Sequence, residues 1–210
     1  MSNSNKILLV SGCSFTFGEE IYDAVYEPGN IHSSKHAWPN VYADLAGYKN
    51  VVNVSEPGAS NHYIARSIIN RATEMRDAGI EFDIAVMWTF LHRGEIYVGE
   101  WDQLGLWHTS KQLFETMCRH LSAEYWSNST ASAEQLVKEF CQLKGIAYNK
   151  WYLGYNNSNY RAHDFYLFGW IEDGKAGIAP SEFPHGPNGH PLEQAQAHAA
   201  RILHEKWRTQ

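Results

Sequence analysis

Residues 6–18 read KILLVSGCSFTFG, and the interpretation of the whole chain starts from this stretch. Its first six residues, 6–11, form a short and largely apolar run, which is typical of a strand buried on both faces of a parallel sheet. Gly12 ends the run, and Ser14 follows two residues later. The sequence therefore predicts a buried first strand with a serine just beyond its carboxyl end.

Strands and helices are expected to alternate along the rest of the chain, because apolar runs alternate with segments of helical spacing. The expected elements are strands at 51–54, 82–88 and 146–148 and helices at 64–75, 113–121, 136–143 and from Pro191 onward. This order indicates an α/β fold, a three-layer α/β/α sandwich around a central, mostly parallel sheet of the flavodoxin-like type.

The length of 210 residues suits one domain with a full hydrophobic core, and we expect residues 1–210 to form it. Residues 155–187 have no clear period and are rich in Gly, Asn, Asp and aromatic residues. A long segment of this kind is often functional, so we expect an insertion there that forms part of a pocket wall. The eight Trp and twelve Tyr either line a sugar-binding surface or fill the core and its rim.

Charge and composition argue against several classes of partner. The formal net charge is −6 and no run of Lys and Arg is present, which argues against nucleic acid. No apolar run is long enough to span a membrane, and the polar N-terminus leads into too few apolar residues for a signal peptide. The three cysteines form no CxxC pair. We therefore expect a cytoplasmic protein.

Three segments at the ends of predicted strands carry candidate chemistry, since sites form there in open parallel sheets. Ser14 follows the first strand, where its hydroxyl can be exposed beside backbone N–H groups that stabilise an oxyanion. Residues 53–61 (NVSEPGASN) follow the second strand, and Gly58 allows the backbone to approach a ligand and donate its N–H. His190, directly before the last helix, has the chemistry of a general base for the serine.

Each of these segments also has a plain structural interpretation. In that interpretation Ser14 only caps a helix, Pro57 and Gly58 form an ordinary turn, and His190 is one of eleven histidines. His185 is a rival base, although a proline at the first helical position would fix the backbone of His190 better.

Taken together and in this order, the motifs resemble the SGNH/GDSL hydrolases. The resemblance rests on Gly-x-Ser with Phe-Thr-Phe-Gly at 12–18, Trp-Pro at 38–39, Asn-x-x-x-Pro-Gly-x-Ser at 53–60 and His-Pro at 190–191. It is greatest for phage and bacterial variants with a Gly-Cys-Ser first block, for which the compartment is the bacterial or host cytoplasm. The resemblance implies the SGNH hydrolase fold.

The resemblance also implies roles for individual residues. Ser14 becomes the nucleophile, His190 the base, and the N–H groups of Ser14 and Gly58 the oxyanion hole. The implied reaction is acyl transfer from a small-molecule or carbohydrate ester to water, without a metal or an organic cofactor.

The chain departs from the family pattern at two places. No Asn follows the third strand, where Thr89 or Arg93 is expected to face the site instead, Arg93 holding an anionic substrate group. Pro187 stands where the family has an Asp three residues before the histidine. Asn188 is the nearest replacement, and if it lies behind the imidazole, Asn188→Asp should raise the rate. Without the acid the rate typically falls about 10⁴-fold, unless Asp164, Glu182 or another carboxylate compensates.

The favoured function is therefore a serine hydrolase of the esterase or carbohydrate acetyl-esterase type. The alternative is a catalytically weak or inactive SGNH-like binding or assembly protein, which the two departures favour. A flavodoxin-like nucleotide binder is disfavoured, because the first loop has few phosphate-binding donors. A metal site is also disfavoured, since the histidines have no metal-ligand spacing. The sequence leaves the oligomeric state open.

Overall fold

A computed structural model describes residues 3–97, 101–104, 111–154, 166–169 and 183–207, and the structure of these residues is reported below. A five-stranded sheet, in the order β4-β1-β5-β8-β9, runs through the centre, and every neighbouring pair is parallel. Its strands are β1 (Ile7–Ser11), β4 (Asn50–Asn53), β5 (Phe82–Trp88), β8 (Tyr148–Gly154) and β9 (Tyr166–Gly169). All seven residues of β5 are buried, as a strand covered on both faces requires.

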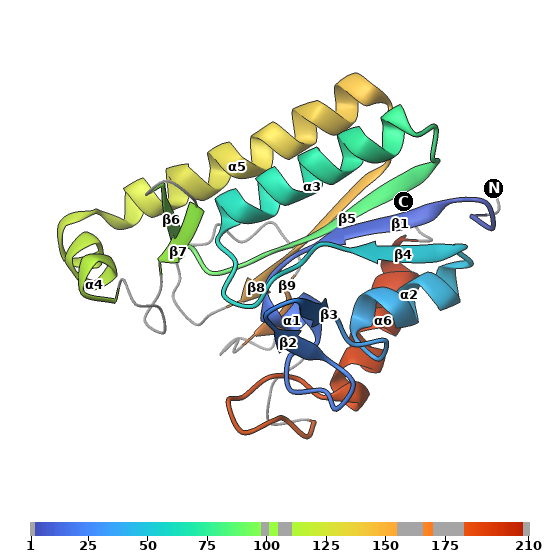
Figure 1. Cartoon of the computed structure of the whole chain (residues 1–210), viewed down its shortest axis with the longest axis horizontal. Coiled ribbons are helices and arrows are strands. Elements are labelled where there is room, and N and C mark those ends of the chain that lie inside the picture. Colours follow the sequence, from blue (N-terminus) through green and yellow to red (C-terminus); the bar gives the residue numbers. More distant parts are fainter. Residues whose placement is uncertain (1–2, 98–100, 105–110, 155–165, 170–182, 208–210) are drawn as a thin grey trace.

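Helices cover both faces of the sheet, so the predicted three-layer α/β/α architecture is confirmed. Figure 1 shows α3 and α5 on one face and α2 and α6 on the other. The helices are α1 (Ser14–Phe17), α2 (Trp38–Ala46), α3 (Asn61–Asp77), α4 (Lys111–His120), α5 (Ala123–Lys144) and α6 (Glu193–Trp207). Ser60 caps α3 by accepting a hydrogen bond from the Tyr63 N–H at 3.0 Å. None of the helices described is long and apolar enough to cross a membrane.

Two small antiparallel hairpins lie outside the central sheet, and neither was expected from the sequence. The first joins β2 (Val25–Glu27) to β3 (Asn30–His32), and the second joins β6 (Gly94–Tyr97) to β7 (Trp101–Leu104). β2 and β3 are only three residues long and mostly exposed, so they lack the buried alternation by which strands are recognised.

The strand order explains why three loops converge. In chain order the central strands are arranged 2-1-3-4-5, and the order reverses between β1 and β5 (Figure 1). Ligands of open α/β sheets bind outside the carboxyl ends of the strands at such a reversal. The loops after β1, β4 and β5 therefore meet at the carboxyl edge of the sheet.

Several expected boundaries differ from those in the structure, and the largest difference is at α5, which begins at Ala123 rather than at residue 136. The strand expected at 146–148 begins only at Tyr148, because the Ile146 N–H donates to the Cys141 carbonyl at 3.0 Å in the turn that closes α5. The last helix begins at Glu193 rather than Pro191, since Pro191 pairs with His185 in an isolated β-bridge. β9 lies inside the segment expected to be an insertion, and the rest of that segment up to residue 182 is outside the described residues.

Candidate active site

Ser14 begins α1, the four-residue helix that follows β1. Gly12 allows the close turn between strand and helix, because a Cβ there would lie 2.1 Å from Thr16 Oγ1. Gly18 ends the helix with a φ of +79°, and its N–H donates to the Ser14 carbonyl at 2.9 Å. Ser14 itself is only 3% exposed. The local backbone therefore holds Ser14 at the carboxyl end of β1, close against the sheet.

The loop after β4 is hydrogen-bonded to the loop after β1. Asn53 Nδ2 donates to the Thr16 carbonyl at 3.0 Å, and the Glu56 N–H donates to the Gly12 carbonyl at 3.2 Å. Within this loop Gly58 has a φ of +81°, a conformation that residues with a side chain rarely adopt. Residues 53–60, called the glycine loop below, are thus hydrogen-bonded to the segment of residues 12–24 that carries Ser14, called the serine loop.

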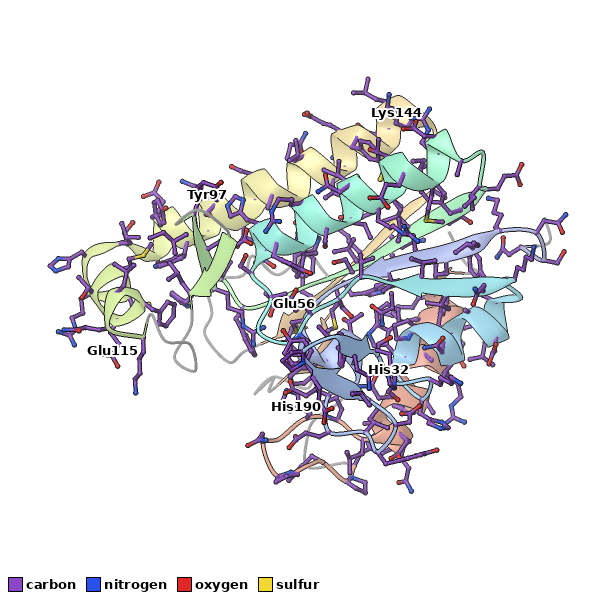
Figure 2. All side chains as sticks on the ribbon, viewed as in Figure 1. His32, Glu56, Tyr97, Glu115, Lys144 and His190 are labelled. Carbon is purple, nitrogen blue, oxygen red and sulfur yellow. The ribbon has the colours of Figure 1, made fainter. Side chains whose placement is uncertain are left out.

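His190 lies in the loop that precedes α6. The His185–Pro191 bridge and a bond from the Gly186 N–H to the His190 carbonyl, at 2.9 Å, close this loop on itself. The His190 ring packs against Phe15, the neighbour of the serine in the sequence, with 5.2 Å between the ring centroids. Figure 2 shows Glu56 near the middle of the view with His190 below it, whereas Lys144 lies at the upper right. The last loop therefore returns to the serine loop.

Two carboxylates flank the imidazole of His190. Glu20 Oε2 accepts hydrogen bonds from Nδ1 at 2.8 Å and from the His190 N–H at 3.1 Å. Glu20 Oε1 accepts from the Asn188 N–H at 2.9 Å and from Asn188 Nδ2 at 2.8 Å. On the other side of the ring, Glu19 Oε2 is 3.3 Å from Nε2. Glu20 thus accepts four hydrogen bonds from the histidine loop.

These hydrogen bonds keep Glu20 ionised. Burial of the carboxyl raises its pKa, but bonds from the Asn188 backbone and from His190 outweigh burial and hold the pKa of Glu20 below its ordinary value of 4.5. The Glu20 side chain is only 10% exposed. A carboxylate in this position orients the imidazole through Nδ1 and stabilises its protonated form.

The expected replacement of the missing acid by Asn188 is wrong in its geometry. Asn188 donates its backbone N–H and one Nδ2–H to Glu20, and among the described residues no hydrogen bond joins it to the imidazole. The rival His185 is exposed, and its Nδ1 faces the Gly186 carbonyl. Within the described part of the chain, no hydrogen bond joins Ser14 Oγ to His190, because the two ring nitrogens face Glu19 and Glu20.

Thr89 and Arg93, which stand where the family has an Asn, are both buried beyond the end of β5. The Thr89 N–H donates to Asn61 Oδ1 at 2.8 Å, and Asn61 Nδ2 donates back to the Thr89 carbonyl at 3.2 Å. Arg93 Nη1 donates to the carbonyl of Ala59 at 3.3 Å. The Arg93 guanidinium also lies over the Phe90 ring, 5.1 Å from its centroid. Arg93 therefore contacts the glycine loop, whereas the Thr89 backbone is bound to α3.

Tyr26 connects the β2–β3 hairpin to the same region. Its hydroxyl donates to Glu56 Oε1 at 3.1 Å, and its ring packs edge-on against Phe17 with 5.8 Å between centroids. Burial and the neighbouring Glu56 carboxylate raise the pKa of Tyr26 to about 12. Tyr26 is therefore a neutral hydrogen-bond donor at physiological pH.

Metal-binding chemistry finds no support in the described residues, where no three His, Cys, Asp or Glu side chains are grouped so as to hold an ion. His62 Nε2 instead contacts Ser129 Oγ at 2.8 Å, and His36 Nε2 contacts the Tyr22 hydroxyl at 2.6 Å. The carboxylates named as possible compensating acids, Asp164 and Glu182, lie outside the described residues.

Sequence reasoning missed Glu20, although a signal for it existed. Two consecutive acidic residues follow Phe-Thr-Phe-Gly, in the same loop as the candidate nucleophile. The family pattern places its carboxylate three residues before the histidine, whereas Glu20 follows the serine in the sequence. The left-handed backbone of Glu20, with a φ of +69°, cannot be inferred from residue type, because such a conformation is uncommon for a glutamate.

A protein-family model, described as a family of unknown function (DUF6071), matches residues 20–129, which are 110 of the 210 residues. The chain belongs to this family. The matched segment contains Glu20, Gly58, Thr89 and Arg93 and ends before the His190 loop. No curated protein matches the sequence.

Solved structures show what the fold resembles. A carbohydrate esterase, whose active site is reported to have divergent catalytic and non-catalytic binding functions, superposes with a TM-score of 0.52 at 9% identity, over 100% of this chain and 67% of the esterase. A carbohydrate esterase family 2 enzyme with a carbohydrate-binding domain, from Corynascus thermopiles (Myceliophthora fergusii), gives 0.53 at 10% identity, over 98% of this chain and 66% of the enzyme. The chain thus spans about two thirds of the length of both.

The psychrotrophic esterase EstA from Pseudoalteromonas matches in full length. It gives a TM-score of 0.50 at 12% identity, over 98% of this chain and 100% of the esterase, in a structure inhibited by monoethylphosphonate. All three neighbours are esterases, and the likeness shows that this chain shares their fold. At identities near 10% this likeness shows the fold and assigns no role to any residue of this chain.

Proposed function

We propose that the protein is a serine hydrolase that cleaves a small or carbohydrate-borne ester, with Ser14 as nucleophile and His190 as base. One observation carries the proposal: the His190 loop returns to the serine loop, and a carboxylate binds Nδ1 of the imidazole. A carboxylate on Nδ1 leaves Nε2 as the nitrogen that takes a proton, which is the arrangement of a general base. The esterase-type fold is consistent with the proposal.

In the proposed reaction, Ser14 Oγ attacks the carbonyl carbon of the ester and gives its proton to His190 Nε2. The oxyanion formed accepts hydrogen bonds from the N–H groups of Ser14 and Gly58. When the carbon–oxygen bond breaks, the imidazolium gives the proton to the leaving alcohol. Water then attacks the acyl-serine, with His190 again taking and returning the proton, and releases the acid.

Two further residues are assigned to substrate binding. Arg93 is buried next to the glycine loop and carries a charge that suits an anionic group of the substrate. Thr89 lies at the end of β5, where its backbone is fixed by Asn61. We assign the whole chain, residues 1–210, to one domain that encloses this site.

A binding or assembly protein without turnover is the second candidate. The observation that favours it is Glu19, whose carboxylate lies 3.3 Å from His190 Nε2, where the serine hydroxyl has to approach. The first carbohydrate esterase described above is also reported to combine catalytic with non-catalytic binding functions. Glu19 is 38% exposed, so it has room to move aside for a substrate.

Labelling with a fluorophosphonate probe and hydrolysis of p-nitrophenyl acetate test the proposal. We expect the wild type to be labelled on Ser14 and to release p-nitrophenol. Ser14→Ala and His190→Ala should each reduce kcat/KM by more than about 10³-fold, since such residues act as a unit. Ser11→Ala is the matched control, because Ser11 is a buried serine of the same segment whose Oγ bonds Ser67 Oγ at 2.9 Å.

Ser11→Ala should keep both labelling and hydrolysis. Equal inertness of the wild type and Ser14→Ala, on a panel of aliphatic and carbohydrate esters and toward the probe, would contradict the hydrolase. The binding protein would then be the better description.

A further inference from the structure

Glu20 takes the chemical place of the aspartate that the family has where this chain has Pro187. The carboxylate is not three residues before the histidine but 170 residues before it, on the loop that carries the serine. It still reaches Nδ1 of His190 at 2.8 Å, and its second oxygen is held by both N–H groups of Asn188. The histidine loop, residues 185–190, thus donates four hydrogen bonds to the two carboxylate oxygens of Glu20.

The backbone on both sides of this contact is specialised. Glu20 has a φ of +69° and is the one non-glycine residue with a positive φ in the described part of the chain. Such a conformation is unfavourable for a residue with a side chain and persists where the surroundings impose it, often at functional sites. Across the contact, a Cβ on Gly186 would lie 2.6 Å from Glu20 Oε2 and 2.7 Å from its Cδ. A glycine is therefore needed for the histidine loop to approach the carboxylate.

We propose that Glu20 is the positioning carboxylate of His190, supplied by the serine loop in place of the acid that is missing from the histidine loop. This inference rests on the proposed function and deepens it. The Nδ1–H of the ring donates to Glu20, so the tautomer with a free Nε2 lone pair is fixed. When Nε2 takes the proton of Ser14, the Glu20 carboxylate stabilises the resulting cation.

Glu19 and Glu20 are the two charged groups that face the ring, and they differ in what they require. The bond from Nδ1 to Glu20 exists in the neutral and the protonated ring alike. The contact between Nε2 and Glu19 is favourable only when the ring carries its second proton, because the lone pair of a neutral Nε2 repels a carboxylate. Deprotonation of His190 therefore frees Nε2 from Glu19 while Glu20 stays in place.

The competing explanation is that Glu20 merely fastens residues 186–190 to the fold. Glu20→Gln separates the two, since glutamine keeps the size and part of the hydrogen bonding but loses the charge. Asp23→Asn is the matched control: Asp23 is another carboxylate of the same loop, held by Ser34 Oγ at 2.5 Å and by the Lys35 N–H at 2.9 Å, away from the ring. Both variants are first checked for folding by circular dichroism.

The decisive measurements are ¹⁵N NMR of the His190 ring, assigned with His190→Gln, and the pH profile of kcat/KM for p-nitrophenyl acetate. For Glu20→Gln we expect an altered Nδ1 signal, a loss of about 10²- to 10⁴-fold in kcat/KM and an acidic limb moved to lower pH. Asp23→Asn should leave all three as in the wild type. An unchanged Nδ1 signal in folded Glu20→Gln overturns the inference, whether or not the wild type hydrolyses esters.

The failure of the proposed function gives a different result, an inert wild type whose Nδ1 signal still depends on Glu20. If Glu20→Gln does not fold, Glu20→Asp is used instead, because it keeps the charge but shortens the reach to Nδ1. A displaced Nδ1 signal in that variant supports the role, and a wild-type signal contradicts it.

Discussion

Two carboxylates with similar hydrogen bonds, Asp83 and Glu20, lie toward opposite ends of the strands of the central sheet and differ in their partners. At the amino edge, Asp83 of β5 accepts bonds from Lys6 Nζ at 2.9 Å and from the Tyr48 hydroxyl at 3.0 Å. At the carboxyl edge, Glu20 accepts four bonds from the Asn188–His190 segment. Both are largely shielded from water, with side chains that are 8% and 10% exposed.

The partners explain the difference. Asp83 binds the ammonium group of Lys6 and the hydroxyl of Tyr48, and burial together with Asp83 raises the pKa of Tyr48 above its ordinary range, so the phenol keeps its proton. Glu20 binds an imidazole, the side chain type that changes charge near neutral pH. Asp83 sits in a regular strand, whereas Glu20 has a strained backbone. A carboxylate with an uncommon backbone conformation and an imidazole partner indicates a role in the site. A carboxylate in a regular strand, bound to a lysine and a tyrosine, indicates a role in stabilising the fold.

The largest expected effect separates the two clusters by stability. Asp83→Asn leaves Lys6 without its counter-charge and should lower the free energy of unfolding by about 1–3 kcal/mol, measured by urea denaturation. The value is at the low end for buried pairs, because the Lys6 side chain is 38% exposed. Hydrolysis by the folded variant should stay within about twofold of the wild type. Loss of activity without loss of stability would remove the contrast with Glu20.

A second prediction concerns Asn188 and reverses the sign expected from the sequence. If Asn188 lay behind the imidazole, Asn188→Asp would raise the rate by restoring a carboxylate. In the structure Asn188 Nδ2 donates to Glu20 Oε1 at 2.8 Å, so an aspartate would place two negative charges side by side. We therefore expect Asn188→Asp to lower kcat/KM about tenfold, and Asn188→Ala to lower it less, since the backbone N–H bond remains.

The sign of the effect is the test, measured at pH 8, where both carboxylates are ionised. A rate above that of the wild type would mean that the new carboxylate, and not Glu20, takes over the imidazole.

The sequence predicted the fold better than the site, for physical reasons. The strands at 6–11, 51–54 and 82–88 and the helix ended by Gly79 are encoded locally, by apolar runs and by stop signals, and the structure contains them. The β2–β3 hairpin was missed, because its strands are three residues long and mostly exposed. The serine and the histidine were singled out by motif, whereas their link through Glu20 depends on a loop–loop contact across 170 residues and on a positive φ. Neither the contact nor the positive φ can be predicted from the local residue types.

The smallest expected effect is in the pH dependence of stability. The pKa of Glu20 is lower in the folded protein than its ordinary value of 4.5, so the carboxylate stabilises the fold. This contribution is fully present above the unfolded pKa and is lost as the pH falls through the lowered folded pKa. The difference in free energy of unfolding between the wild type and Glu20→Gln should therefore shrink as the pH falls below about 4.5. Urea denaturation at half-unit pH steps measures it, with Ser11→Ala as a variant whose difference from the wild type does not change with pH. A difference for Glu20→Gln that stays constant down to pH 3 would mean that the four bonds fasten a loop without favouring the charge, which is the property that the proposed role of Glu20 requires.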